Sequence, residues 1–224
     1  MVVVIPQNTA IFLDELNEKL FYNKEIPEEE WNKLAEIIVT KLQRKGREKG
    51  CLALSAEEYF NGAQLFTGEK MNTKLAIKNI LTLNALSILK SKQALSEDTI
   101  EAISIIEEWI VNSCFSKFCT VGECKHSTLG YLYYLANLTS EEKYDEFLAI
   151  LKHHRDGTGR WKGFPYFYTL YILLLVNTSE ALEELQYSAS VIEKNYKFIS
   201  TDDKYSQRRK ELLQRVMSKI YEVF

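Results

Sequence analysis

Residues 80–86 read Ile-Leu-Thr-Leu-Asn-Ala-Leu, and two similar stretches follow: Leu-Gly-Tyr-Leu-Tyr-Tyr-Leu at 129–135 and Tyr-Thr-Leu-Tyr-Ile-Leu-Leu at 168–174. All three are apolar on nearly every side when they are drawn as helices. A helix without a polar face must be enclosed by other helices. The stretches are roughly 40 to 48 residues apart, which is the size of an antiparallel helix-pair repeat. The sequence therefore predicts inner helices that are ringed by outer ones.

The composition favours helices along the whole chain. Only 9 Gly and 3 Pro stand among 224 residues, too few for the frequent turns of a β-sandwich. Apolar spacing and helix-start signals, such as Pro27 and the Ser55-x-x-Glu58 capping box, predict about ten helices and no strand. We interpret residues 1–224 as one all-α domain of antiparallel helix pairs, arranged as a complete or an incomplete α/α toroid. The predicted helices cover residues 8–22, 27–46, 55–65, 73–90, 97–111, 127–138, 140–153, 165–176, 179–198 and 203–223.

The charge pattern argues against nucleic-acid binding. Lys and Arg number 28 against 31 Asp and Glu, which gives a net charge of -3, whereas nucleic-acid-binding domains are usually basic. Basic residues nevertheless gather between Lys204 and Lys219, where Glu211 is the single acid. The helix expected at 203–223 therefore presents either an ordinary solvated face or a docking site for an acidic protein partner.

The chain shows no signal for secretion or membrane insertion. The start from Met1 to Pro6 lacks the positive charge of a signal peptide. The longest apolar run, Phe164 to Val176, is shorter than the about 20 residues of a membrane span, so we expect a core helix there. Four cysteines in such a chain are expected to be reduced thiols or metal ligands, and we expect the protein to be cytoplasmic.

Chemistry-bearing residues gather between 114 and 171. Cys114, Cys119, Cys124 and His126 form a C-x4-C-x4-C-x-H pattern with enough soft ligands for a tetrahedral zinc ion, of which Cys119, Cys124 and His126 are the metal-ligand candidates. The alternative is that the cysteines are buried free thiols without a metal.

A base and a carboxylate are also candidates for catalysis. His126 and Asp156 would serve as the polar groups at the mouth of a cavity, with Asp156 orienting a histidine that acts as a base. His154 would face the same cavity. The alternative is that His153 and His154 are cationic groups that cap the end of a helix.

Aromatic residues could line that cavity. Tyr131, Tyr134, Trp161, Phe164 and Tyr168 would form the walls around a hydrophobic small molecule. The alternative is that these rings belong to the hydrophobic core, in which case each buried hydroxyl needs only a hydrogen-bond partner.

A glycine-rich loop precedes the third apolar stretch, with glycines at 157, 159 and 163. It fits neither a dinucleotide-binding nor a phosphate-binding loop. We expect the glycines to adopt positive φ in a tight turn that lays Trp161 and Phe164 against the helix ends.

This region resembles known repeat proteins over about 30 residues, from Ile150 to Tyr171. Ile150-Leu151-x3-Arg155-x3-Gly159-x-Trp161 is similar to the repeated motif of the triterpene cyclases, with Arg155 in place of Gln and Ile150 in place of the aromatic. The turn from Asp156 also resembles the repeat turns of protein prenyltransferase β subunits. The resemblance implies a toroid whose inner helices line an apolar cavity. The acidic motifs of the cyclases and the zinc ligands of the prenyltransferases have no counterpart, so it implies little about activity.

Three functional hypotheses follow. The chain binds, or acts as an enzyme on, a hydrophobic small molecule; or it is a helical-repeat interaction scaffold without a catalytic site; or it is a helical domain that zinc stabilises. A homo-oligomer is compatible with each.

Overall fold

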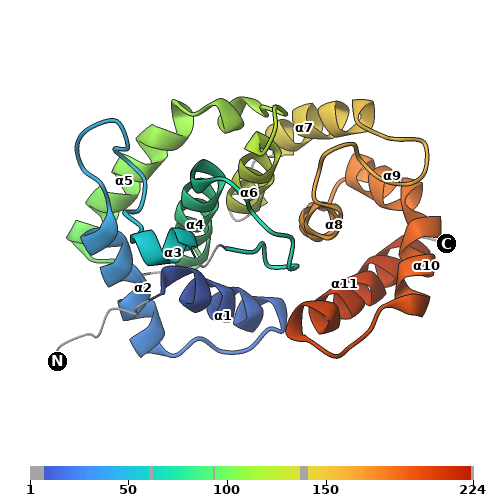
Figure 1. Ribbon diagram of the computed structural model, residues 1–224, viewed down its shortest axis with the longest axis horizontal. Coiled ribbons are helices and arrows are strands. Elements are labelled where there is room, and N and C mark those ends of the chain that lie inside the picture. The colour runs from blue at the N-terminus through green and yellow to red at the C-terminus, as the bar shows by residue number, and fades with distance from the viewer. Residues whose placement is uncertain (1–7, 61–62, 93, 137–140, 223–224) are drawn as a thin grey trace. The chain divides into compact units, whose positions relative to one another are not determined.

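The computed structural model describes residues 8–60, 63–92, 94–136 and 141–222. Within these ranges the chain forms eleven α-helices, one short 3-10 helix and no strand (Figure 1). The prediction of an all-α protein is confirmed. No helix in the described ranges combines the length and the apolar character that crossing a membrane requires. The helices are α1 (Thr9–Phe21), α2 (Glu28–Lys41), α3 (Ala56–Phe60), α4 (Lys74–Leu89), α5 (Glu97–Val111), η1 (Cys114–Lys117), α6 (Cys124–Ala136), α7 (Glu141–His153), α8 (Tyr166–Leu175), α9 (Ser179–Tyr187), α10 (Ala189–Phe198) and α11 (Lys204–Tyr221).

Contacts along the chain define two compact units. Unit 1 consists of Met1–Ala63 and Lys70–Asn137, and unit 2 consists of Gln64–Glu69 and Leu138–Phe224. The chain therefore leaves unit 1 for the short segment 64–69, returns, and leaves it again near residue 138. The single domain and the toroid of the sequence analysis stay predictions.

Unit 1 is built around α4. Every residue of α4 from Ala76 to Leu89 is buried, and α4 packs against α6 and also contacts α1, α2 and α5. The approach of α6 is close because Gly130 has no side chain: a Cβ there would lie 2.7 Å from Cδ1 of Ile80. The enclosed position predicted for residues 80–86 is confirmed.

Unit 2 is built around α8, which contacts α9 and α11. At the start of α8 the carboxylate of Glu69 accepts hydrogen bonds from the backbone N–H groups of Phe167 and Tyr168, at 2.8 and 3.1 Å. Arg208 of α11 is fully buried and donates to the carbonyl of Phe66 at 3.1 Å. These bonds attach the segment 64–69 to the helices of unit 2.

Two predicted helices are shorter than expected. The helix predicted for 27–46 ends at Lys41, because the next residues pair with a returning strand-like segment: Gln43 donates to Cys51, and Ala53 donates to Lys41. The helix predicted for 55–65 is observed as Ala56–Phe60, and residues 63–65 are not helical: Met71 N–H donates to the carbonyl of Ala63. Residues 61–62 lie outside the described residues.

Other boundaries also differ from the prediction. The helix predicted for 179–198 is interrupted at Ser188, whose hydroxyl bonds to the carbonyl of Gly159 and to the hydroxyl of Tyr166. The cap of α11 is Asp203, and α6 begins at Cys124 rather than residue 127. The predicted start of α7 at residue 140 lies outside the described residues.

The Ser55-x-x-Glu58 capping box is confirmed and extends to a second helix. The Ser55 N–H donates to Glu58 Oε2 at 2.7 Å, and the Glu58 N–H donates to Ser55 Oγ at 3.1 Å. The same carboxylate accepts from the N–H of Thr9 at the start of α1, at 2.9 Å, and from Lys41 Nζ at 3.1 Å. Burial opposes the ionisation of Glu58, but these hydrogen bonds outweigh it and lower its pKa to about 2.

We expect Glu58→Gln to lower the free energy of unfolding at pH 7 by about 1–3 kcal/mol, because hydrogen bonds to a charged acceptor are replaced by weaker ones. The folded-state pKa of Glu58 lies below the unfolded-state value. The stabilisation is therefore complete above about pH 5 and is lost as the pH falls toward about 2. Urea unfolding of both proteins across this range measures the effect. The exposed neighbour Glu57 gives the control Glu57→Gln, and an equal loss in both variants would contradict the assignment.

Candidate metal centre

Three cysteines of unit 1 bring their sulfur atoms together. The Sγ atoms of Cys114, Cys119 and Cys124 all lie within 4.8 Å of one another, and those of Cys114 and Cys124 are 3.9 Å apart. A tetrahedral zinc ion with Zn–S bonds of about 2.3 Å holds its sulfur ligands about 3.8 Å apart. The spacing of this thiol cluster is therefore close to what one ion requires.

The cysteines are presented by a loop that is anchored in the core between α5 and α6 (Figure 1). Phe115 and Phe118, which are next to Cys114 and Cys119 in the sequence, are buried. Phe115 contacts the rings of Trp109 and Tyr131 at centroid distances of 5.1 and 6.1 Å, and Phe118 contacts Tyr131 at 6.1 Å. Burial of both rings fixes the backbone from which the thiols project.

Polar contacts fix the second half of the same loop. The carboxylate of Glu123 accepts from the backbone N–H groups of Asn72 and Thr73 at 2.9 and 2.8 Å, at the start of α4. Burial disfavours the Glu123 carboxylate, but hydrogen bonds from Thr73 and Asn72 outweigh it and lower the pKa. Thr128 Oγ1 donates to the carbonyl of Cys119 at 2.8 Å. Glu123 thus ties the loop to the start of α4, and Thr128 ties it to α6.

The environment of the thiol cluster disfavours free thiolates. Burial and the neighbouring sulfurs of Cys114 and Cys119 raise the pKa of Cys124 to about 12. Sulfurs this close together disfavour one another's negative charge, and a bound cation removes that penalty because it attracts all three thiolates. In unit 1 the other thiol, Cys51, is buried, and burial raises its pKa to about 11.

The structure brings two of the three expected ligands together, and the role of His126 as a ligand stays a prediction. Cys119 and Cys124 belong to the cluster, Cys114 joins them, and His126 lies outside this group of ligand atoms. Cys124 and His126 are two residues apart on α6, and side chains at that spacing face different sides of a helix. The sequence shows the spacing of the cysteines, but its pattern predicts that α6 begins at residue 127 rather than at Cys124.

Asp156, the second predicted catalytic residue, belongs to unit 2, whereas His126 belongs to unit 1. Asp156 Oδ1 accepts from Thr158 N, Thr158 Oγ1 and Arg160 N at 2.7, 2.8 and 3.1 Å. These bonds, with one from the Tyr187 hydroxyl, lower the pKa of Asp156 to about 2. Asp156 therefore holds the turn together as a carboxylate. Its proposed catalytic partnership with His126 stays a prediction.

His153 and His154 occupy the end of α7, as the capping interpretation expects. Their Nδ1 atoms lie 2.7 and 3.1 Å from the carbonyl oxygens of Ala149 and Ile150. The ring of His154 also contacts that of Phe164, with a centroid distance of 5.3 Å.

The turn geometry predicted for the glycine-rich loop is confirmed. Glycines 157, 159 and 163 have φ of 83°, 92° and 74°. Trp161 is buried beneath the turn, and its Nε1–H donates to Glu184 at 2.7 Å. The same buried carboxylate forms an ion pair with Arg155 at 2.8 Å. The ion pair from Arg155 and the hydrogen bond from Trp161 thus connect the two ends of the turn to α9.

The predicted cavity walls are all buried side chains. Tyr131 and Tyr134 lie in unit 1, and their rings stack at a centroid distance of 6.3 Å. Trp161, Phe164 and Tyr168 lie in unit 2 and are buried as well. Burial agrees with the core interpretation. Their contact with a hydrophobic ligand stays a prediction.

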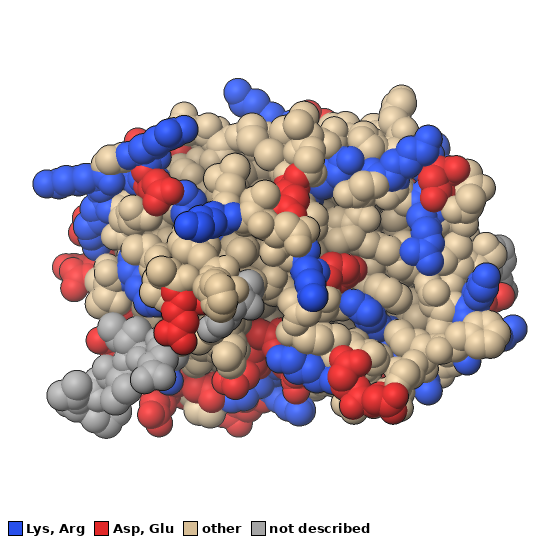
Figure 2. Space-filling model, in the orientation of Figure 1, with Lys and Arg blue, Asp and Glu red and all other residues tan. Residues whose placement is uncertain are grey.

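The basic run of α11 is engaged within unit 2. Besides Arg208, Arg209 Nε donates to the carbonyl of Thr67 at 2.6 Å and Lys219 Nζ donates to those of Leu174 and Val176 at 3.1 and 2.9 Å. Figure 2 shows charged side chains of both signs interspersed over the face in view.

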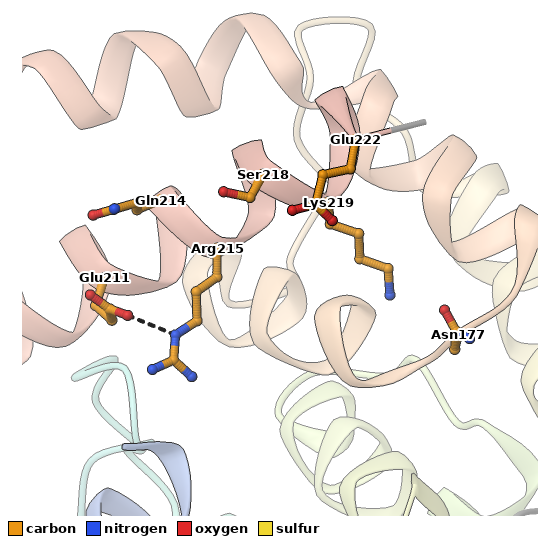
Figure 3. Close-up of a pocket in the computed structure, with 7 residues that line it drawn as sticks. All are labelled: Asn177, Glu211, Gln214, Arg215, Ser218, Lys219 and Glu222. Carbon is orange, nitrogen blue, oxygen red and sulfur yellow. Dashed lines mark hydrogen bonds and ion pairs between the residues drawn. The ribbon is translucent and has the colours of Figure 1, made fainter. Parts of the chain in front are cut away.

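A hollow of about 480 Å³ lies along α11 (Figure 3). Its lining includes two acids, Glu211 and Glu222, beside Arg215 and Lys219. Arg215 Nε donates to Glu211 at 2.7 Å, and Lys219 caps the end of α8 as described above. Most of the charged side chains that line this hollow therefore bond to other groups of unit 2.

Comparisons with protein families, with curated proteins and with solved structures found no matching family, protein or structure. The resemblance to the triterpene cyclases and prenyltransferases stays a prediction. Functional conclusions about this chain therefore depend on its own geometry.

Thiol accessibility tests this arrangement without any metal. Brief treatment of the native, reduced protein with N-ethylmaleimide is expected to modify the exposed Cys114 and to spare Cys51, which is buried with a raised pKa. Peptide mapping by mass spectrometry identifies the modified residues. Cys51 should react once the protein is denatured. Equal modification of both residues in the native protein would contradict the described burial.

Proposed function

We propose that this protein binds one thiophilic metal ion, with zinc as the first candidate, through Cys114, Cys119 and Cys124. One observation carries the proposal: the three Sγ atoms lie within 4.8 Å of one another. Thiolates are soft ligands that select zinc, copper(I) and iron–sulfur centres over magnesium or calcium.

The anchoring of the loop supports a site that exists before the ion arrives. Phe115 and Phe118 are held by core contacts, and Glu123 is held by the start of α4. Ligands held in place lose less conformational freedom when they bind. The ion would therefore be a ligand of a folded unit rather than the element that makes it fold.

Three protein ligands leave a fourth position of a tetrahedral ion for water or an external ligand, as in zinc sites that exchange ligands. Cys114 is exposed, so this position is open to solvent. A small hollow of about 200 Å³ next to Cys124 is lined mainly by apolar surface and includes Leu75 and Val121. It provides space for a small external ligand, such as a low-molecular-weight thiol.

We expect the reduced protein to bind one Co²⁺ per chain, with an intense sulfur-to-metal absorption band that Zn²⁺ abolishes by displacement. Serine at any one of the three positions is expected to weaken binding by more than about 100-fold, because replacing a group that merely orients a ligand typically costs about 10–100-fold. Competition with a chromophoric chelator measures the affinity.

The matched control is Cys51→Ser, which removes a thiol of unit 1 outside the cluster. This variant should bind cobalt and zinc as the unaltered protein does. Failure of the unaltered protein to bind, or equal weakening by Cys51→Ser, would overturn the proposal. Circular dichroism of each variant separates loss of a ligand from loss of fold.

The two zinc hypotheses differ in one measurable respect. If zinc stabilises the fold itself, a chelator removes helical content. If zinc binds a unit that is already folded, the chelator leaves helical content unchanged and lowers only the melting temperature, because the stabilisation by the bound ion is lost. The hydrophobic-ligand and scaffold hypotheses stay predictions. Native mass spectrometry addresses the first, since a retained organic molecule adds its own mass to the chain.

A further inference from the structure

A groove in unit 2 combines apolar surface with positive charge. It has a volume of about 380 Å³ and is lined by Phe167 of α8, by Lys194, Asn195 and Phe198 of α10, by Ile199 and by Arg209 of α11. The charged residues in this lining are Lys194 and Arg209, and both are cationic. This sets the groove apart from the mixed-charge hollow along α11.

The arginine of the groove is held in position. Arg209 Nε donates to the carbonyl of Thr67 at 2.6 Å, and its guanidinium lies over the ring of Phe167, 4.7 Å from the ring centroid. The remaining guanidinium N–H groups form the planar fork that suits a carboxylate. Holding the guanidinium in advance reduces the entropy lost when an anion binds.

Apolar surface extends beyond the groove to an exposed aromatic side chain. Phe198 is 80% exposed at the end of α10. Isolated exposed apolar residues are ordinary, but this one borders an apolar groove with a charged rim, and that combination marks interaction sites. An occupant that removes Phe198 from water must cover the end of α10 as well as fill the groove.

We infer that this groove docks an acidic segment of a partner protein, with one apolar side chain of the segment beside Phe198 and Phe167. Its carboxylates would pair with Arg209 and Lys194. An extended segment covers both the groove and Phe198. An anionic membrane fits less well, because the apolar surface here is hollow rather than protruding.

The probe is a panel of short labelled peptides in which acidic residues flank a Leu-Phe pair at varied spacing, tested by fluorescence anisotropy with the full chain. At least one should bind, and its affinity should fall as salt rises. Peptides with lysine in place of the acids, or serine in place of Leu-Phe, should not bind.

Two substitutions in the groove should each weaken binding by about tenfold or more, as for a central contact of an interface: Phe198→Ser and Lys194→Glu. Both side chains are exposed, so the fold should not depend on them. The matched controls are Phe60→Ser, at a phenylalanine of unit 1 that is 90% exposed, and Lys197→Glu, at an exposed lysine of α10 outside the lining. Both controls should retain full affinity.

Three outcomes would overturn the inference. The first is that no peptide binds, or that groove and control substitutions weaken binding equally. The second is binding to phosphatidylserine vesicles that Phe198→Ser abolishes, which would assign the surface to a membrane. The third is sedimentation of the unaltered chain as a dimer that Phe198→Ser dissociates, because a second copy would then cover the groove.

Discussion

The fold of unit 1 depends on one constraint: α4 has no face that can meet water. Every residue from Ala76 to Leu89 is buried, so other helices have to cover α4 on all sides. Gly130 lets α6 approach closely enough to do this. Some of the polar groups inside are bonded: Asn79 Nδ2 donates to Ser127 of α6 at 3.1 Å, and Thr82 donates to the carbonyl of Lys78 at 2.8 Å. The side-chain oxygens of Asn79 and Asn84 are buried without a hydrogen-bond partner among the described residues. The loop that carries the thiol cluster begins after α5 and ends at α6, so this packing also fixes its two ends.

Helix content could be predicted from the sequence because apolar spacing and capping residues act over a few residues. The three apolar stretches and the Ser55–Glu58 box are examples in which local pattern and tertiary structure agree. The break at Ser188 could not be predicted, because it depends on hydroxyl contacts with Gly159 and Tyr166, more than twenty residues away. The end of α2 likewise depends on the chain returning at residues 51–53.

The residue types of the candidate metal site could be predicted from the sequence, but which of these residues come together could not. The spacing of the cysteines indicated soft ligands, but the choice between Cys114 and His126 depends on where α6 begins. A helix that starts at Cys124 places that residue at the edge of the loop and turns His126 away. The role of Asp156 was hidden for a similar reason: a carboxylate next to two glycines can serve a turn or a reaction, and only its hydrogen-bond partners distinguish them.

The attachment of residues 64–69 to unit 2 has a consequence for the order of folding. A ribosome adds residues in sequence, and N-terminal regions generally fold first. The segment 64–69 emerges early, yet Glu69 contacts α8 and the carbonyl of Phe66 contacts Arg208, which are made more than 90 residues later. Unit 1 can complete its own core during synthesis, whereas this segment lacks its partners until α8 and α11 have left the ribosome. Unit 2 can therefore complete its structure only after α11 has been made.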